Sequence, residues 1–340
     1  MPSSGTQRIR YFDWARALGA LAVVALHVVV TTARVDAFWN VQQDVFFVEG
    51  IACIPLARGA VPAFFMMSGA LMLDPAREMG WRKVGRHVWR LCFVLLTWGF
   101  AFSLVEAALD AGGLSPAVVG EAAVNTLGGR SWDHLWFLYA LLVLYAITPI
   151  LRPWVARASR QELGLATLVL WGALCVAPTL SLLLGVGVLD WVRLPYSLVY
   201  YLAGLYAHRY LRLDGRVVVA GVAACLAMAA LRLLHVPNAD DAVMPQYAFA
   251  LPLGVLALCL LRRLVGETDI SSRPVMRVLA DYSFGIYVLH PLFCHLVVWF
   301  ARPEAWPLGL LQAFMFVASI VGSVALSWLC RQIPCLGDKL

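Results

Sequence analysis

The sequence predicts an all-α polytopic membrane protein with about ten transmembrane helices, on the grounds of composition, apolar runs and charge placement. Of its 340 residues, 62% are hydrophobic and 14% are charged, with a mean hydropathy of +0.79. Soluble domains contain roughly 25% charged residues, so this chain lacks the side chains to coat a water-facing surface. The apolar runs also lack the alternating pattern of a membrane β-barrel. We therefore expect residues 1–340 to form a single transmembrane domain with no soluble domain.

Ten apolar stretches are long enough to cross a bilayer, which takes about 20 mostly apolar residues in a helix. The second stretch contains Pro55 and Pro62. Proline removes a backbone donor and kinks a helix, so we expect this span to be broken. In chain order, the expected spans lie near residues 11–33, 52–73, 87–108, 134–151, 162–184, 192–210, 216–235, 244–262, 277–299 and 308–331.

The basic residues predict the orientation of these spans, because Lys and Arg are enriched in cytoplasmic loops. With the N-terminus inside, 20 of the 26 basic residues fall in inner loops or at inner helix ends, so both termini are expected to be cytoplasmic. The net charge of +6 then reports topology and contact with membrane lipids rather than nucleic-acid binding. The eight cysteines show no CxxC or Cys/His ligand spacing. We therefore expect no metal site.

The first span contains three ionisable residues, Asp13, Arg16 and His27. Each costs roughly 3 kcal/mol to insert, which makes it a candidate functional residue. On a helix, Arg16 and His27 lie within about 20° of each other and about 16 Å apart along the axis, with Asp13 about 60° away. A snorkelling pair at the helix end would also explain Asp13 and Arg16, and an interhelical hydrogen bond would explain His27.

The ninth span repeats this arrangement in the segment DYSFGIYVLHPLFCHL. His290 lies about 20 Å along the helix from Arg277, a depth similar to that of His27. Pro291 cannot donate a hydrogen bond to the carbonyl of Tyr287, which predicts a kink. A structural role at this kink and a role in a functional site are both open for Tyr287 and His290.

The third span opens with a basic cluster of Arg82, Lys83, Arg86 and Arg90. The positive-inside pattern and anionic lipid headgroups explain such a cluster in general. Arg86 and Arg90, however, are one helical turn apart on one face and reach into an apolar helix. A multiply charged phosphate ligand would be a better partner for them than lipid alone.

The fourth span opens with His134, Trp136 and Tyr139, which place hydrogen-bonding groups beside aromatic faces. This combination suits a sugar, although tryptophans are also typical of the membrane interface. Ser68 and Gly69, at the inner end of the second span, indicate close helix packing.

Several motifs follow one another in a fixed order along the chain. They are D-x-x-R with ten further residues before His27, PAFFMMSG at 62–69, the arginine-rich opening of the third span, HLWFLYALLVLYAITPIL at 134–151, YYLAGLY at 200–206 and SFGIYVLHPL at 283–292. Together they resemble the acyltransferase 3 family of integral-membrane acyltransferases, from about residue 10 to 331. Within the family, the sequence is most similar to the enterobacterial common antigen O-acetyltransferase type.

The resemblance implies transfer of an acyl group, usually acetyl, from cytoplasmic acyl-CoA to a hydroxyl of a cell-surface polysaccharide or lipid-linked sugar. The transfer would take place at the outer side of the bacterial inner membrane, with acetyl-CoA as donor and no metal. Carried over by position, Arg16 would contact the donor, Arg86 and Arg90 would hold its phosphates, and His27 would be the catalytic residue. With the patterns above, the expected sites are a donor site of Arg16, Ser68, Arg82, Arg86 and Arg90 and an acceptor site of His134, Trp136, Tyr139, Tyr287 and His290.

We hypothesise that neutral His27 is a general base on the acceptor hydroxyl, with Asp13 or a neighbouring polar group setting its environment. A covalent acyl-histidine step is an alternative. Some relatives carry a fused extracytoplasmic hydrolase-like domain, and we expect none here. The rival function is a transporter or flippase for a lipid-linked sugar, which polar residues at mid-membrane would also serve. Transporters often contain paired broken helices, whereas this sequence shows one clear break.

Overall fold

The computed structural model describes residues 9–39, 41–187, 194–266, 268–301 and 305–333, and all regular elements there are helical. This confirms the all-α prediction. Arg8, Lys339 and the first residues of the sixth expected span lie outside the described residues. The α-helices are α1 Arg10–Ala33, α2 Asp36–Trp39, α3 Gln43–Ala52, α4 Ile54–Arg58, α5 Ala60–Met72, α6 Trp81–Val94, α7 Phe100–Asp110, α8 Pro116–Leu127, α9 Trp136–Arg157, α10 Arg160–Trp171, α11 Ala177–Leu184, α12 Ser197–Tyr210, α13 Gly215–Leu233, α14 Ala239–Ala242, α15 Ala250–Val265, α16 Pro274–Asp281, α17 Ser283–Phe300 and α18 Leu308–Arg331.

Seven helical segments in the described residues are long and apolar enough to cross a membrane. Two of them continue through a π-helical turn: α6 joins α7 through Leu95–Gly99, and α10 joins α11 through Gly172–Val176. The other three expected spans correspond to α5, α12 and α15, which have 13, 14 and 16 residues. A polytopic helical protein is therefore confirmed, while the count of ten spans stays a prediction.

The second expected span is broken, as its prolines predict. Residues 52–73 form α4 and α5, with an interruption at Gly59, and Cys53 separates α4 from the preceding helix α3. Pro55 lies in the first turn of α4, where its missing N–H costs nothing. The helix α4 ends at Arg58, whose side chain is buried. The helix α8, which packs against α7, was not expected from the sequence.

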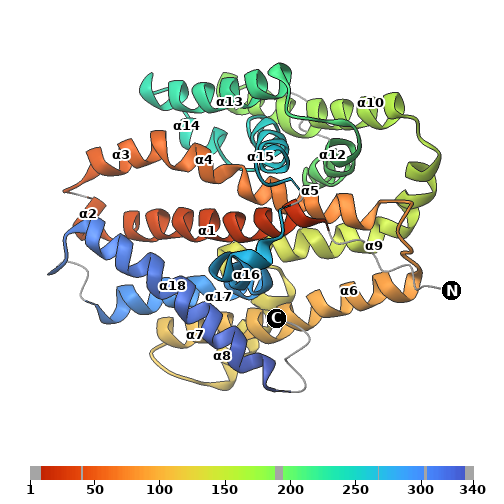
Figure 1. Ribbon diagram of the computed structural model, residues 1–340. Coiled ribbons are helices and arrows are strands. Elements are labelled where there is room, and N and C mark those ends of the chain that lie inside the picture. Colours follow the sequence, from red (N-terminus) through yellow and green to blue (C-terminus); the bar gives the residue numbers. More distant parts are fainter. Residues whose placement is uncertain (1–8, 40, 188–193, 267, 302–304, 334–340) are drawn as a thin grey trace.

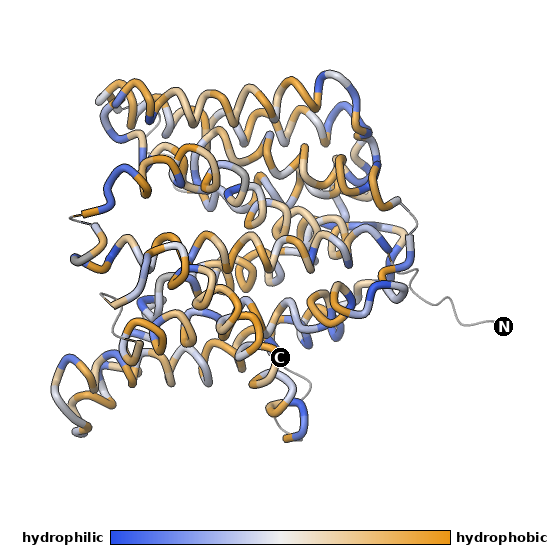
Figure 2. The backbone as a smooth tube through the Cα atoms, turned by 60° about the vertical axis from the view of Figure 1, so that its left-hand side comes forward, coloured by the Kyte–Doolittle hydropathy of each residue, from blue (hydrophilic) through white to orange (hydrophobic). Residues whose placement is uncertain are grey.

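Helix α1 crosses the middle of the bundle, with α10 and α13 on one side and α17 and α18 on the other (Figure 1). It packs against α5, α15, α16, α17 and α18, so both ends of α1 are surrounded by other helices. Hydrophobic colours run along the helices in Figure 2, while hydrophilic ones gather mainly in the turns and at helix ends. Functional groups on α1 are thereby held inside the protein at two different depths.

The helices α5 and α12 approach each other most closely, at two glycines. A Cβ on Gly69 would lie 1.8 Å from the carbonyl oxygen of Tyr201, and a Cβ on Gly204 would lie 1.9 Å from that of Met66. Only glycine fits at such distances, which is how small residues bring membrane helices together. Close packing is therefore the role of Gly69, as its sequence context indicates, and it turns the adjacent Ser68 toward a different neighbour.

The start of α1 meets the ends of α5, α12 and α15 at what we call the basic end of the bundle. There Arg209 forms an ion pair of 2.6 Å with Asp74, and the Tyr11 hydroxyl lies 2.8 Å from Nδ1 of His208. Arg262 donates to the carbonyl oxygen of His208 at 2.7 Å. We call the end at which α1 finishes the opposite end. The assignment of the basic end to the cytoplasm stays a prediction.

Candidate active site

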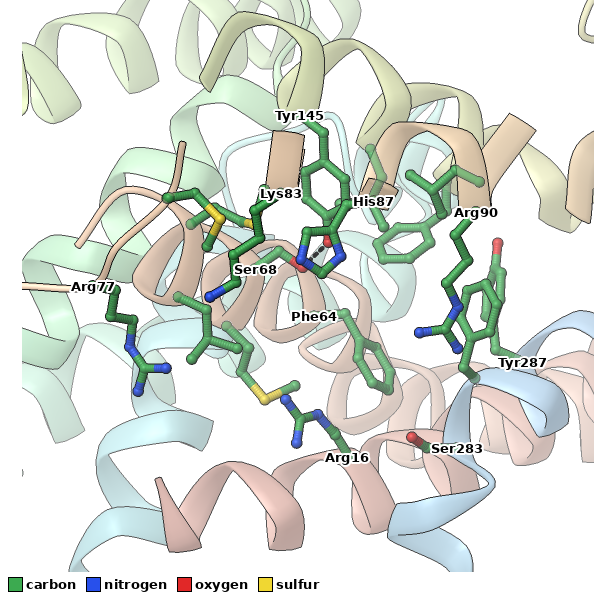
Figure 3. Close-up of a pocket in the computed structure, with 18 residues that line it drawn as sticks. Arg16, Phe64, Ser68, Arg77, Lys83, His87, Arg90, Tyr145, Ser283 and Tyr287 are labelled. Atoms are coloured by element: carbon green, nitrogen blue, oxygen red, sulfur yellow. Dashed lines mark hydrogen bonds between the residues drawn. The ribbon is translucent and has the colours of Figure 1, made fainter. Parts of the chain in front are cut away.

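A cavity of ≈ 390 Å³ lies at the basic end, between α1, α5, α6, α9 and α17. We call it the cation cavity, because none of the described residues that line it is acidic and five of them are basic or imidazole side chains. These enter from three directions in Figure 3 and surround an otherwise mostly apolar space. The five are Arg16, Arg77, Lys83, His87 and Arg90.

Helix α6 contributes most of these groups through one of its faces. Lys83, His87 and Arg90 are spaced by four and three residues, so they share a side of the helix and line the cavity. Arg82 and Arg86 lie on the exposed side and do not line it. The expected pairing of Arg86 with Arg90 is therefore not formed, because packing against α9 turns the Lys83 face inward.

Arg16 is held in the cation cavity by Asp13, one turn earlier on α1. The two side chains form an ion pair of 2.9 Å, with the carboxylate almost fully buried. Asp13 precedes His27 by 14 residues, which is about 21 Å along a helix. The structure thus places Asp13 beside Arg16 and away from His27, so this carboxylate cannot act on the imidazole directly.

The polar groups on the cavity wall are themselves positioned by neighbours. The Tyr145 hydroxyl donates to Ser68 Oγ at 3.4 Å (Figure 3). Lys83 donates to the carbonyl oxygen of Glu78 at 3.2 Å, and the guanidinium of Arg90 lies 4.7 Å from the ring centroid of Phe284. Ser68, expected at the donor site, is therefore among the cavity residues.

The turn between α5 and α6, which borders the cavity, is fixed by an arginine of α9. Arg152 donates to the carbonyl oxygens of Met72 at 2.6 Å, Asp74 at 3.0 Å and Arg77 at 2.6 Å. It satisfies the carbonyls that the end of a helix leaves without partners. This clamp holds Arg77 at the mouth of the cavity.

Aromatic side chains form the inner end of the cation cavity. Phe64, Phe137 and Tyr287 line it, and the ring centroids of Phe137 and Tyr287 are 5.1 Å apart. The Tyr287 ring is also 5.7 Å from that of His134, on the side away from the cavity. Tyr287 therefore separates the cavity from a group of histidines that lies deeper in the bundle.

Three histidines from three helical segments meet behind this wall, and we call them the histidine cluster. The ring centroids of His27 and His290 are 4.8 Å apart, those of His134 and His290 5.6 Å, and those of His27 and His134 6.4 Å. His134 and His290 are buried, whereas His27 is partly exposed. No group of three or more His, Cys, Asp or Glu in the described part of the chain could hold a metal ion.

Backbone hydrogen bonds fix which nitrogen carries the proton in each neutral ring. Nδ1 of His27 lies 2.9 Å from the carbonyl oxygen of Val23, which can only accept, so Nδ1–H donates and Nε2 presents its lone pair. Nε2 of His134 donates to the carbonyl of Val288 at 3.0 Å. His27 is therefore in the tautomer that a general base needs, with its basic nitrogen turned away from its own helix.

His290 also repairs the break that Pro291 makes in α17. Its Nδ1–H donates to the carbonyl oxygens of Ile286 and Tyr287, both at 2.9 Å. The Tyr287 carbonyl is the one that Pro291, having no N–H, leaves without its helical donor. This is the structural one of the two roles that the sequence left open for His290, and it leaves Nε2 of His290 buried without a hydrogen-bond partner in the described residues.

The five residues expected to bind the acceptor do not form one site. His134, Tyr287 and His290 are core groups, and the Tyr287 hydroxyl donates to the carbonyl of His134. Trp136 packs against other rings, and the Tyr139 hydroxyl donates to the carbonyl of Thr126 at 2.5 Å. His134, Trp136 and Tyr139 are close in sequence, but the short helical turn at Asp133–Leu135 and the start of α9 direct them to different neighbours.

A second, larger cavity of ≈ 1040 Å³ lies at the opposite end, where α1 finishes. It is bounded by the end of α1, by α2 to α4, and by the end of α13 with α14. We call it the opposite cavity. Its polar and aromatic lining residues are Arg34, Trp39, Gln43, Asp44, Phe46, Phe47, Arg58, Arg232, His235, Asn238, Asp240 and Asp241.

Sequence reasoning missed several groups of both cavities. Two of them could have been recognised in the cation cavity: His87 lies on one helical face with Lys83 and Arg90, and Tyr145 is a polar position in the mostly apolar α9. Arg58 and Arg232 were counted only as basic residues outside the positive-inside pattern. Their shared position in the opposite cavity depends on tertiary contacts that spacing along one helix does not give.

This fold and site define a polytopic helical membrane protein with a cation-lined cavity and a deeper histidine cluster. Comparison with family models gives a match to the acyltransferase 3 family, described as an acyltransferase domain, over residues 9–331. The chain belongs to this family, and it is a multi-pass membrane protein. Neither curated proteins nor solved structures give a match. The expected enterobacterial common antigen type therefore has no support from a relative.

Proposed function

We propose that the protein transfers an acetyl group from acetyl-CoA, bound from the cytoplasm, to a hydroxyl of a glycan or lipid-linked sugar across the bacterial inner membrane. Membership of the acyltransferase 3 family supports acyl transfer as the reaction class. The choice of donor, acceptor and catalytic base rests on the two cavities and the histidine cluster. The topology that this requires has both termini and the basic end in the cytoplasm.

The cation cavity suits the phosphate groups of the donor. Phosphates are bound through charge-assisted hydrogen bonds, and arginine supplies a planar fork of donors for them. Arg16, Lys83 and Arg90 bring such donors to one space from α1 and α6, and no described acidic residue competes there. The apolar part of the cavity is suited to the thin, mostly uncharged arm that carries the thioester.

Helix α1 links this cavity to the histidine cluster. Arg16 and His27 are 11 residues apart on nearly the same face, about 16 Å along the axis. A donor held by its phosphates near Arg16 would have to pass Phe64, Phe137 and Tyr287 to bring its thioester to His27. We propose that these rings move aside when the donor binds.

In the proposed step, Nε2 of His27 takes the proton from the acceptor hydroxyl while the hydroxyl oxygen attacks the thioester carbonyl. The carbon–sulfur bond then breaks, and the leaving thiolate takes the proton back from the imidazolium. The Nδ1–H bond to the Val23 carbonyl holds the ring in the required tautomer throughout. Asp13 serves this step only by holding Arg16.

The observation that carries the proposal is that α1 presents two groups on nearly one face. One is an ion-paired arginine in the cation cavity, and the other is a histidine in the tautomer of a general base, about 16 Å deeper. The test uses purified full-length protein in lipid nanodiscs, radiolabelled acetyl-CoA and a membrane glycan extract. We expect label to move to the glycan in the wild type. Movement of a lipid-linked sugar between leaflets without acetyl-CoA consumption would instead favour the transporter.

A further inference from the structure

The opposite cavity contains two buried guanidinium groups that the proposed catalytic step does not use. Arg58 is 9% exposed at the end of α4, and its Nε has no hydrogen-bond partner in the described residues. Arg232, near the end of α13, has a side chain only 15% exposed, and its Nε is likewise buried without a partner there. Both residues line the same space.

The carboxylates of this cavity do not neutralise both groups. Arg232 pairs with Asp240, whose side chain is 79% exposed, while Arg58 has no ion pair in the described part of the chain. Asp44 and Asp241 also lie exposed at the rim. Burying a charge costs several kcal/mol unless it is paired. The buried guanidinium of Arg58, without an ion pair in the described residues and in the same cavity as that of Arg232, therefore indicates a place for an anion.

The guanidinium of Arg232 packs directly on α3, since a Cβ on Gly50 would lie 1.3 Å from its Nη1. Arg58 is set by the broken course of the second span, since α4 ends at it. Neither side chain is a snorkelling residue at a lipid surface, because both end in the cavity between α1, α3 and α13.

The rim carries groups that suit a sugar ring. Trp39 is 47% exposed, and the rings of Phe47 and His235 stack with centroids 5.6 Å apart. His235 and Asn238 adopt positive φ angles of 50° and 61°, in the left-handed region that His and Asn enter more readily than most residues. Both residues line the cavity.

We propose that the opposite cavity is the acceptor site and that the acceptor is acidic, with its oxyanion bound by Arg58 and Arg232. The oxyanion is either a sugar carboxylate or the phosphate of a lipid-linked sugar. This proposal rests on the proposed acyl transfer and adds the charge of the substrate. The cavity reaches Val30 of α1, three residues beyond His27, so a hydroxyl on the anchored sugar would lie about one helical turn from the imidazole.

The test measures binding of defined probes to the full-length protein in nanodiscs by microscale thermophoresis. The probes are glucuronate for the sugar carboxylate, farnesyl phosphate for the lipid phosphate, and glucose as the neutral match. We expect one of the two anions to bind at least about tenfold more tightly than glucose, as a charge-assisted bond would give. The anion that binds more tightly shows whether the site takes a sugar carboxylate or the phosphate of a lipid-linked sugar.

Arg58→Gln and Arg232→Gln should each weaken anion binding about tenfold or more while leaving glucose binding within about twofold. Arg130→Gln removes an exposed charge that does not line the opposite cavity and serves as the control. Arg58→Lys keeps the charge and should retain part of the affinity if Arg58→Gln does not fold. Equal binding of anions and glucose, or equal losses in Arg130→Gln and Arg58→Gln, would overturn the acidic-acceptor proposal.

Acetyl-CoA binding to the same wild-type preparation separates this proposal from the proposed function. If acetyl-CoA binds but neither anion does, the acidic acceptor is wrong and acyl transfer stands. If an anion binds through Arg58 and Arg232 but acetyl-CoA is neither bound nor consumed, the anion site stands and acyl transfer is wrong.

Discussion

The two cavities of this protein contain arginines for different reasons. In the cation cavity, basic groups stand in a mostly apolar space with no described acidic lining, whereas the opposite cavity mixes two buried guanidiniums with exposed carboxylates, amides and aromatic rings. The first is also the smaller, at ≈ 390 Å³ against ≈ 1040 Å³. The difference shows that arginines alone do not define a ligand. The groups around them determine whether the rest of an anionic ligand is apolar or carries hydroxyls.

In the proposed function, a strongly charged, thin ligand binds at one end of α1 and a polyhydroxylated, singly anchored ligand binds at the other. The histidine cluster lies between the two, reached past Tyr287 from one side and from Val30 on the other. A protein that joins ligands from opposite ends in this way can be tested by variants that affect only one of the three regions.

The largest effect is expected from His27→Ala, which removes the proposed base between the cavities. Loss of a general base lowers kcat by about 10²- to 10⁴-fold. Transfer of labelled acetyl to glycan would be measured, with circular dichroism and thermal unfolding as controls for folding. Near-normal transfer by a stable His27→Ala protein would remove His27 from the reaction and leave the cluster a structural feature.

A smaller but selective effect is expected from Arg90→Gln in the cation cavity. Loss of a charge-assisted phosphate contact raises the KM for acetyl-CoA by about 10- to 100-fold with kcat largely kept. Arg86→Gln, on the exposed side of the same helix, is the matched control and should change KM by less than about twofold. The same KM increase in both variants would mean that α6 attracts the donor only through its overall charge.

His290→Phe tests whether the histidine cluster stabilises the fold. It leaves the buried Tyr287 carbonyl without the Nδ1–H donor, which should lower the free energy of unfolding by about 1–3 kcal/mol. Pro291→Ala in the same chain restores a backbone N–H and should recover part of that loss. The midpoint of thermal unfolding in detergent measures both changes. If His290→Phe is as stable as the wild type, this carbonyl is satisfied in another way.

The smallest effect is expected from Asp13→Asn. Because the carboxylate pairs with the partly exposed Arg16, we expect the KM for acetyl-CoA to rise by about two- to fivefold with little change in kcat. The pH profile of kcat should keep its shape. A shifted profile with unchanged KM would instead show that Asp13 acts on His27, as the sequence first suggested.

The sequence predicted the helical class, the broken second span and the shared face of Arg16 and His27 on α1. Arg16 in the cavity and His27 beside His290 both face α17, because helical periodicity fixes relative angles along one helix. The sequence does not predict which face of a helix turns inward, because that depends on the neighbouring helix. On α6 the inward face carries Lys83 and His87 rather than Arg86, and this depends on packing against α9.

The sites built from distant segments could not be predicted at all. Arg58 and Arg232 meet only because the broken second span and the end of α13 are folded against the same end of α1. Their basic charge was visible in the sequence, but a buried pair is defined by tertiary contacts. His134 was placed at a surface for the opposite reason, since nothing in its local sequence shows the bond to the Val288 carbonyl.

In the proposed function, donor binding and chemistry are separated along α1. The direct measurement is the dissociation constant of acetyl-CoA for purified His27→Ala and for the double variant Arg16→Gln/Arg90→Gln, with transfer assayed on the same samples. We predict that His27→Ala binds acetyl-CoA like the wild type while transferring none. The double variant should bind at least about 100-fold more weakly. Wild-type affinity in the double variant, or loss of binding in His27→Ala, would contradict the separation.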